Sequence, residues 1–508
     1  MSILKKNIYF NVAGKLWSTV VGLVFIPIYL RLLGAEAFGL IAFFTTMLAA
    51  FQIFEFGLGT TINRELARFS SGGVRAQDVR DLARTFEVIY FLVALCIGAS
   101  VVLAASFLSA EWLRVQSMPL GEATTAVAQM GVAIALLWPC NFYHNGLVGL
   151  ERQVVQNTVS AALSTVRGMG AVCALLFMGR NIHVFFLWQI AFGSIQLAVL
   201  AFCFWHYMPR HARRPHFRIA QLIRVWRFTV ALGATGVVSF ILSQLDKLLL
   251  SSMLPLVLFA YYSLANQVSM ASRMLPSALY SAFFPRFSAL VARGDEKQLR
   301  RLYHQASQLV ALIVFPGAMV GAFFAPQILR VWSGSPDIAL HAGPIASVLL
   351  VGSAINSMMG ILYDITIARG LPSLGFYQNL ISVIILGPAM LFMAGTYGGI
   401  GAAIVWLVLN LGYLTISAPI VHARVLPGEL TNWYFVDICC ALIPSASIAL
   451  IAKFLMPTVA SLWLTVAGIV SAWSVATVLC AFVLPEIRGY IFRKVADFVN
   501  TRRLRRAG

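Results

Sequence analysis

The stretch Ile26–Phe43 reads IPIYLRLLGAEAFGLIAF and joins two long apolar runs. Its charged residues are Arg31 and Glu36. An apolar run of about 18 residues or more is long enough to cross the hydrocarbon core of a membrane as a helix. The sequence therefore predicts two membrane spans joined by a tight turn, in which Gly34 permits the chain to reverse.

The composition extends this pattern to the whole chain. Of its 508 residues, 60% are hydrophobic and only 11% are charged, and the mean hydropathy is +0.85. A soluble domain averages about 25% charged residues. The alternating segments of an outer-membrane barrel are not found in the sequence. We therefore expect an all-α integral membrane protein.

The apolar runs predict about fourteen transmembrane helices. These spans are residues 8–30, 36–63, 85–109, 121–147, 155–178, 183–207, 226–252, 257–282, 302–324, 341–367, 373–394, 399–421, 433–456 and 461–484.

Two stretches that lie six spans apart resemble each other. GLVGLERQVVQNTVSAAL begins at Gly146 and ARGLPSLGFYQNLISVII begins at Ala368. Both place Gly-Leu near the end of one span and Gln-Asn at the start of the next. Because six is even, the two copies share one membrane orientation, which predicts two parallel six-helix lobes. The expected parts are an N-lobe (1–207), a basic cytoplasmic linker (208–225), a C-lobe (226–421), two extra C-terminal helices (433–484) and a basic tail (485–508).

Basic residues gather in alternate connections. Segments 64–84, 208–227, 283–301 and 485–508 each carry five or more Lys or Arg residues, whereas the opposite loops carry one or none. The positive-inside rule then places both termini in the cytoplasm. The net charge of +19 is explained by topology and by contacts with membrane lipids, so no nucleic-acid partner is expected.

Several classes of catalytic or metal site are missing from the sequence. It has no Walker A loop, HExxH or GxSxG motif. Its seven cysteines lie in apolar stretches without a CxxC pair, so no metal and no cofactor is expected. The chain is therefore predicted to be a transporter and not an enzyme, driven by an ion gradient, by its substrate or by another protein.

Polar and ionisable residues form stripes along predicted spans 1, 2, 7 and 8. Such residues are costly in a membrane and indicate functional sites. Cations outnumber acids, so we expect a cationic cleft between the lobes that takes an anionic substrate. The candidate substrate-binding residues are Asn11, Lys15, Asn63, Arg64, Lys247, Asn266 and Arg273. The candidate gating or coupling residues are Arg31, Glu55, Asp246 and Asp364.

Structural roles are an alternative for each of these residues. Polar stripes also hold helices together, and Asp246 and Lys247 could form a structural ion pair. Lys15 could extend to the cytoplasmic surface, and Arg31 and Arg64 could anchor at the membrane interface. Arg167, alone in span 5, is a further candidate cation.

Three segments resemble one family. YLRLLGAEAFGL from Tyr29, FEFGLGTTINRELAR from Phe54 and SQLDKLLLSSML from Ser243 are similar to segments of the Wzx-type polysaccharide or O-antigen flippases of the multidrug/oligosaccharidyl-lipid/polysaccharide (MOP) exporter superfamily. The resemblance implies a V-shaped, MATE-like fold. It also implies alternating access that carries an undecaprenyl-diphosphate-linked oligosaccharide from the cytoplasmic to the periplasmic leaflet of the bacterial inner membrane.

Other partners and functions stay open. A polymerase or other polysaccharide-assembly proteins are candidate partners, and a proton or sodium ion is a candidate coupling ion. The alternative functions are a cation-coupled drug exporter of the same superfamily and a peptidoglycan lipid-precursor flippase. The sequence does not separate sugar substrates. A membrane-embedded glycosyltransferase or polymerase is disfavoured because every predicted outer loop is short.

Overall fold

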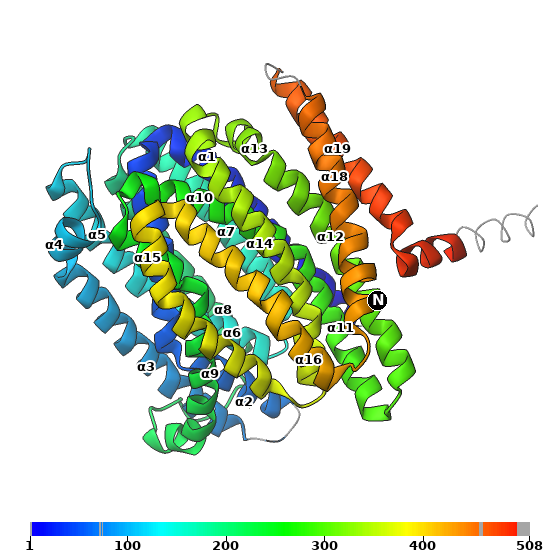
Figure 1. Cartoon of the computed structure of the whole chain (residues 1–508). Coiled ribbons are helices and arrows are strands. Elements are labelled where there is room, and N and C mark those ends of the chain that lie inside the picture. Colours follow the sequence, from blue (N-terminus) through cyan, green and yellow to red (C-terminus); the bar gives the residue numbers. More distant parts are fainter. Residues whose placement is uncertain (1–2, 71–72, 74, 457–460, 495–508) are drawn as a thin grey trace, which may run out of the picture. The chain divides into compact units, whose positions relative to one another are not determined.

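The computed structural model describes residues 3–70, 73, 75–456 and 461–494. For residues 3–13, 15–16, 227–228, 231–232, 234–236, 238–239 and 242 it describes the backbone alone. Every regular element in these ranges is helical (Figure 1). By their internal contacts, the helices group into two units, Met1–Ser263 and Leu264–Gly508.

In the first unit, α1 runs along α7, and α5 packs between α3 and α8. Its elements are α1 (Ile3–Ala50), η1 (Phe51–Glu55), α2 (Leu58–Ser70), α3 (Ala76–Leu103), α4 (Ala105–Phe107), η2 (Leu108–Trp112), α5 (Leu120–Leu137), α6 (Cys140–Gly149), α7 (Gln153–Phe177), α8 (Ile182–Tyr207), α9 (Ile219–Met253) and the first turns of α10 (Leu256–Ser272).

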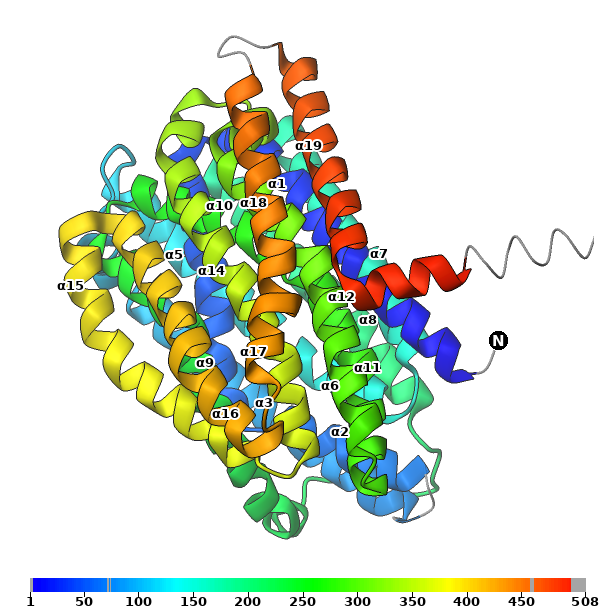
Figure 2. The same ribbon diagram turned by 45° about the vertical axis from the view of Figure 1, so that its right-hand side comes forward.

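In the second unit, α12 and α14 form the core, because both bury most of their length. α18 and α19 lie side by side against α12 (Figure 2). The elements are α11 (Met274–Arg293), α12 (Glu296–Phe323), α13 (Ala325–Ser333), α14 (Pro336–Ala368), α15 (Pro372–Gly412), η3 (Tyr413–Ser417), α16 (Ala418–Val425), α17 (Leu430–Asn432), η4 (Trp433–Cys439), α18 (Cys440–Leu455) and α19 (Leu462–Val483).

Within the described ranges, ten helices are long and apolar enough to cross a membrane, so the chain is a multi-pass membrane protein. Two of the ten are pairs of helices that meet at a kink, at Gly34 (φ +83°) and at Gly398 (φ +60°). Glycine adopts these left-handed conformations at little cost. The turn expected at Gly34 is thus present. The count of fourteen spans and the layout as two six-helix lobes stay predictions.

The span predicted over residues 36–63 is not one continuous helix. It is interrupted where Phe56 and Gly57 have φ values of 42° and 78°, between η1 and α2. Residues in the left-handed region cannot continue an α-helix. The expectation of an unbroken span was therefore wrong at this point.

The span predicted over residues 257–282 is also broken, at Arg273 between α10 and α11. Pro276 lies in the first turn of α11 and has no N–H group to donate to the carbonyl of Ser272, the last residue of α10. A proline also clashes with the carbonyl four residues before it. This proline weakens the helix at the break, where the carbonyl of Ser272 receives no N–H from residue 276.

The sequence predicts α9 as the first helix of the second lobe. In the structure, α9 packs against α1, α2 and α3, all of the first unit. The lobe boundary predicted at residues 208–225 stays a prediction.

Candidate functional site

The break after η1 places the carboxylate of Glu55 against two side chains from other helices. Glu55 Oε1 accepts hydrogen bonds from Tyr90 Oη on α3 (2.9 Å) and from Asn145 Nδ2 on α6 (3.3 Å). Trp138 Nε1 donates to the carbonyl oxygen of Phe51 in η1 (2.9 Å). A broken helix is tolerated at membrane depth where other groups satisfy its free backbone atoms. Discontinuous helices also mark binding sites in transporters.

Two glycines allow the neighbouring helices to approach this break. A Cβ atom on Gly59 would lie 1.9 Å from Glu55 Oε1. A Cβ atom on Gly233 of α9 would lie 2.7 Å from the carbonyl oxygen of Phe56. Heavy atoms cannot approach so closely. A Cβ at residue 233 would require the Phe56 backbone to shift, and a Cβ at residue 59 would displace the side chains of Glu55 and Asn145. The break is thus a tightly packed part of the first unit.

Arg167 brings a cation into the interior of the first unit. Its Nε donates to Gln189 Oε1 of α8 (2.6 Å), and its guanidinium carbon lies 5.9 Å from the ring centroid of Phe44. Gln189 is buried. Within the described ranges, no carboxylate lies at ion-pair distance from Arg167. A cation in such a place lacks a charge partner, and an anionic ligand would supply one.

The turn after Gly34 holds a second polar site through Glu36. Glu36 Oε1 accepts from the backbone N–H of Gln116 (2.6 Å), and Oε2 accepts from that of Met118 (3.0 Å). The N–H group and hydroxyl of Ser117 also donate to this carboxylate. Successive N–H groups that point inward form a concave anion site, which the buried Glu36 fills here. We name the contact between the Glu36 carboxylate and the backbone of residues 116–118 the elbow clasp.

The end of η2 and the loop that follows it, residues 113–118, also contact the end of α9 and the start of α10. The backbone N–H of Leu256 donates to the carbonyl of Arg114 (3.4 Å), and Trp112 Nε1 donates to Ser251 Oγ (3.0 Å). A Cβ atom on Gly39 would lie 2.6 Å from the Leu256 carbonyl oxygen. Two turns of the chain, at Gly34 and before Leu256, therefore meet at one loop.

The structure brings together Asp246 and Lys247 of α9, two residues that the sequence predicted as sites. Lys247 Nζ lies 3.2 Å from Asp246 Oδ1, and Tyr262 Oη donates to Asp246 Oδ2 (2.6 Å). Lys247 Nζ also donates to the carbonyl of Ser243 (2.9 Å). The ion-pair alternative stated for these residues is therefore the geometry observed.

In the second unit, Arg273 lies at the break between α10 and α11. Its guanidinium carbon is 5.5 Å from the ring centroid of Trp406 on α15, a cation–π contact. Trp406 Nε1 donates to Ser353 Oγ of α14 (3.4 Å), and Ser269 of α10 shares a hydrogen bond with the same hydroxyl (2.7 Å). Arg273 thus lies beside a polar contact between three helices.

Asp364 on α14 is a candidate coupling residue with an unsatisfied atom. Its Oδ2 is buried and has no hydrogen-bond partner in the described part of the chain. Tyr280 lies within electrostatic range of both Asp364 and Arg273. Buried polar atoms without a partner are rare, so this carboxylate is suited to bind a proton or a cation.

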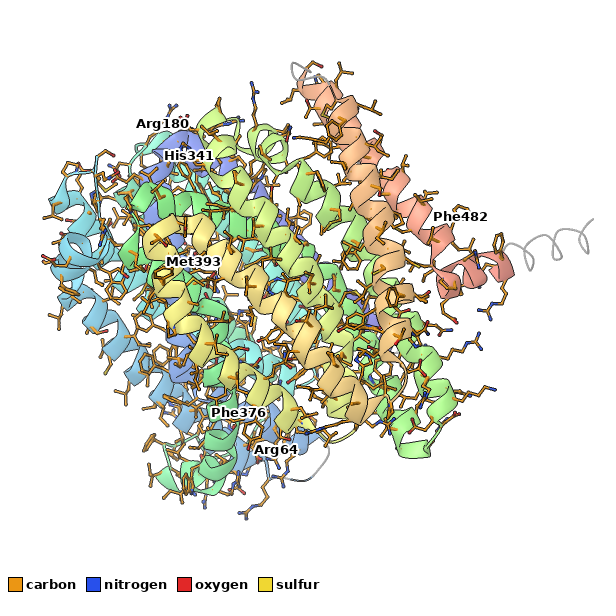
Figure 3. All side chains as sticks on the ribbon, in the orientation of Figure 1. Arg64, Arg180, His341, Phe376, Met393 and Phe482 are labelled. Atoms are coloured by element: carbon orange, nitrogen blue, oxygen red, sulfur yellow. The ribbon has the colours of Figure 1, made fainter. Side chains whose placement is uncertain are left out.

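Arg31, Arg64 and Asn266 are further predicted site residues. Arg64 lies on α2 and is exposed, at the opposite end of the first unit from Arg180 (Figure 3). The side of the membrane on which each of their loops lies stays a prediction. Arg31 is exposed before the Gly34 kink, and Asn266 Nδ2 donates to Met270 Sδ (3.5 Å).

Three predicted residues add little more to the geometry. Asn63 contributes backbone atoms to a close contact with α6, where a Cβ on Gly149 would lie 2.6 Å from its carbonyl oxygen. The side chains of Asn11 and Lys15 lie outside the described residues. The roles assigned to all of these residues stay predictions.

The sequence did not predict Glu36, Tyr90, Asn145, Gln189 or Trp406 as parts of these sites. For Glu36 a signal exists, because it is an acid two residues after a turn glycine, where a helix N-terminus favours negative charge. The other four could not be predicted from the sequence, because their contacts depend on how helices far apart in the sequence pack together.

Comparison with known proteins gives the family. The model of the family described as "Polysaccharide biosynthesis protein" matches residues 4–291, and that of the MatE family matches residues 232–393. A Shigella flexneri protein named "Putative O-antigen transporter" is 23% identical over 409 residues, which are 80% of this chain and 94% of that protein.

Two solved structures share the fold. The lipid II flippase MurJ in an inward closed conformation aligns with a TM-score of 0.70 at 14% identity, over 94% of this chain and 98% of that chain. An inward-facing MATE family multidrug transporter aligns with a TM-score of 0.66 at 13% identity, over 82% and 96%. The "Polysaccharide biosynthesis protein" match spans more than half of the sequence, and the chain therefore belongs to the polysaccharide biosynthesis protein family, the Wzx-type branch of the MOP superfamily.

Proposed function

We propose that this protein is a flippase for polysaccharide precursors. It moves an undecaprenyl-diphosphate-linked oligosaccharide from the cytoplasmic to the periplasmic leaflet by alternating access. The observation that carries this proposal is the family match over residues 4–291, together with the relation to an O-antigen transporter along most of the chain. The relation to transporters also supports a role outside catalysis.

The charge of the candidate sites supports an anionic substrate. Arg167 lies in the helix bundle without a carboxylate partner in the described ranges, and Arg273 lies at a helix break beside Trp406. A diphosphate offers each guanidinium a partner of opposite charge and can accept two parallel hydrogen bonds from it. We assign diphosphate recognition to Arg167 and Arg273, and to Lys15, Arg64 and Lys247 as further cations.

Polar residues near these cations in the sequence would contact the sugar. Asn11, Asn63 and Asn266 are the proposed contacts, because an amide both donates to and accepts from hydroxyl groups. Arg31, Glu55 and Asp246 are proposed to act in gating. Asp364, with its buried unsatisfied Oδ2, is the proposed site for a coupling proton or sodium ion.

The setting of the protein is part of the proposal. The multi-pass chain lies in the bacterial inner membrane with both termini in the cytoplasm, and it receives its substrate from the enzymes that build the lipid-linked unit. A polymerase or other assembly protein in the periplasm would take the product. Reporter fusions after residue 485 test the orientation of the C-terminus.

The test is a leaflet assay in spheroplasts of a strain that lacks the protein. The strain is complemented with the wild type, with Arg273→Ala, or with Arg180→Ala as a control at an exposed arginine. We measure the fraction of sugar-diphosphate lipid that reagents reach from outside. The proposal expects a low fraction in the empty strain and with Arg273→Ala, and a normal fraction with Arg180→Ala. If the lipid crosses equally well without the protein, the proposed substrate is wrong.

The same assay separates the alternatives. A peptidoglycan-precursor flippase would restore the accessibility of lipid II in a strain depleted of its own flippase, and this protein is expected not to do so. A drug exporter would instead lower the accumulation of organic cations. Organic cations need a free acidic site; Asp246 is paired with Lys247, so Asp364, with its unsatisfied Oδ2, is the acid whose replacement by Asn would test this alternative.

A further inference from the structure

A group of titratable side chains in the second unit lies outside the sites described above. His304, on α12, stands between two carboxylates. Its Nδ1 lies 2.6 Å from Asp437 Oδ2 in η4, and its Nε2 lies 3.0 Å from Glu429 Oε2, just before α17. Neither carboxylate belongs to α12, so one imidazole joins three segments of the chain.

The two distances require one extra proton. A neutral imidazole carries hydrogen on one nitrogen only, and its other nitrogen is an acceptor. An ionised carboxylate is also an acceptor, so a neutral ring could satisfy only one of the two contacts. Because imidazole is more basic than a carboxyl group by roughly two pH units, the extra proton lies on the ring. The geometry is therefore that of an imidazolium between two carboxylates.

The surrounding charges balance this imidazolium. Glu429 Oε1 accepts from Arg300 (2.6 Å), and Asp437 Oδ1 accepts from Gln308 Nε2 (2.9 Å). Two cations therefore face two carboxylates. Asp437 is fully buried, and without the proton on His304 it would keep a charge in the interior with no cation at contact distance among the described residues. Such a charge is strongly unfavourable.

Other polar groups around the ring have partners of their own. His422 Nδ1 lies 2.8 Å from the carbonyl of Ala418 and its Nε2 lies 2.9 Å from Tyr303 Oη, which fits a neutral ring. Glu486, after α19, contacts Arg301 (3.9 Å) and accepts from Gln305 Nε2 (2.9 Å). The amide of Asn432 lies 3.3 Å from His304 Nε2, and Tyr434 Oη donates to the carbonyl of Leu414.

The partners of α12 belong to the segment that leads into the last two helices. Glu429 precedes α17, and Asp437 lies in η4, which is a π-helix that continues into α18. α-Helices rarely contain π-helical turns, which are frequent at functional sites. The backbone N–H of Glu486 also donates to Gln308 Oε1 of α12 (2.8 Å). Polar contacts thus tie both ends of the α18–α19 pair to α12.

We propose that His304, Asp437 and Glu429 form a proton-binding clasp, in which one proton on His304 fastens the α17–η4 segment to α12 and its loss releases that segment. The clasp ties the mobility of the α18–α19 pair to pH. This proposal does not depend on which substrate the transporter carries. A negative flippase assay therefore does not contradict the proton-binding clasp, and a negative result for the clasp does not contradict the flippase function.

The first experiment measures the protonation state directly. The full-length protein, with ¹⁵N-labelled histidine, is reconstituted in lipid vesicles and examined by solid-state NMR between pH 6 and pH 9. The chain has eight histidines, so the signals missing from His304→Gln identify His304. We expect both ring nitrogens to carry hydrogen at pH 6 and one to lose it as the pH rises. A neutral ring at pH 6 overturns the proposal.

The second experiment measures release of the segment. Hydrogen–deuterium exchange of residues 426–440 is followed in vesicles at several pH values, as protection factors, which cancel the intrinsic pH dependence of exchange. In the wild type we expect the protection to fall by about tenfold or more when His304 loses its proton. His304→Gln is expected to be unprotected at every pH. His341→Gln, at an exposed histidine on α14, is the matched control and should behave as the wild type.

A lysine variant separates a proton-operated clasp from a static contact. His304→Lys keeps a positive charge that does not titrate between pH 6 and pH 9. The proposal expects this variant to be protected without any dependence on pH, and it can be studied even if His304→Gln does not fold. A wild-type pH response that persists in His304→Lys, or equal protection of wild type and His304→Gln, overturns the proposal.

Discussion

The Glu36 carboxylate accepts a hydrogen bond from the backbone N–H of Met118, 3.0 Å away and 82 residues later in the chain. The N–H groups of Gln116 and Ser117 donate to the same carboxylate. One side chain therefore holds the first turn of the protein to a loop between two other helices. This loop also contacts the start of α10 through Leu256. The loop therefore contacts both the Gly34 turn and the start of α10.

Glu36→Gln should weaken the elbow clasp. The amide keeps one acceptor oxygen, but its NH₂ group faces N–H donors and leaves them unsatisfied. A buried donor without a partner costs about 1–3 kcal/mol. We expect a lower thermal unfolding temperature in detergent and slower precursor transport. Glu122→Gln, at an exposed glutamate in the first turn of α5, is the control. Equal unfolding temperatures for the two variants would contradict the role assigned to Glu36.

Arg167→Gln should separate stability from function. Within the described residues the guanidinium has no carboxylate partner, so removing its charge relieves a desolvation cost. We expect an unchanged or higher unfolding temperature and a large loss of transport in the leaflet assay. Arg180→Gln should change neither. If Arg167 only holds helices together, its variant loses stability and transport in parallel.

The limits of the sequence are clearest at the two broken spans. Hydrophobicity predicts a helix over 36–63, and the helix-breaking signal of Gly57 is weak because glycine is common in membrane helices. Pro276 is a stronger signal, since proline removes a hydrogen bond, but Pro316 lies within α12 without ending that helix. Whether a proline breaks a helix depends on what neighbouring helices offer to the freed carbonyl. That information is absent from a single sequence.

The contacts of the candidate site residues also differ in how far the sequence alone predicts them. The Asp246–Lys247 contact is local and could be foreseen as an ion pair. Arg167 could be noticed as a lone cation, but its contact with Gln189 depends on how α7 packs on α8. Glu55 was predicted without its partners, because Tyr90 and Asn145 come from helices that are far apart in the sequence. Residue type thus predicts a candidate, and packing decides its environment.

Gly59→Ala should disrupt the broken helix in the first unit. The new Cβ would lie 1.9 Å from Glu55 Oε1 and 2.5 Å from Asn145 Nδ2, so the hydrogen bond between these side chains must break or α2 must shift. We expect a lower unfolding temperature, with a cost of about 1–3 kcal/mol as for overpacking of a core. The control is Gly22→Ala in α1, where a Cβ has no neighbour within 4 Å. The control is expected to be neutral or slightly stabilised, and a loss as large in the control would contradict the close contact at Gly59 as the cause.

Glu429, in the loop before α17, should make the stability of the folded protein decrease in acid. Partial burial favours the neutral carboxyl group, but hydrogen bonds from His304 and Arg300 outweigh it and hold the pKa of Glu429 below its ordinary value of 4.5. The unfolded chain therefore binds this proton more readily than the folded protein does. The contribution of Glu429 to stability is complete above about pH 4.5, and it is lost as the pH falls through the lower pKa of the folded state.

Unfolding temperatures of the wild type and Glu429→Gln, measured from pH 7 to pH 3, should differ most at neutral pH and converge in acid. Glu122→Gln is the matched control. If the difference between Glu429→Gln and the wild type stays constant down to pH 3, the ionised carboxylate of Glu429 does not stabilise this loop.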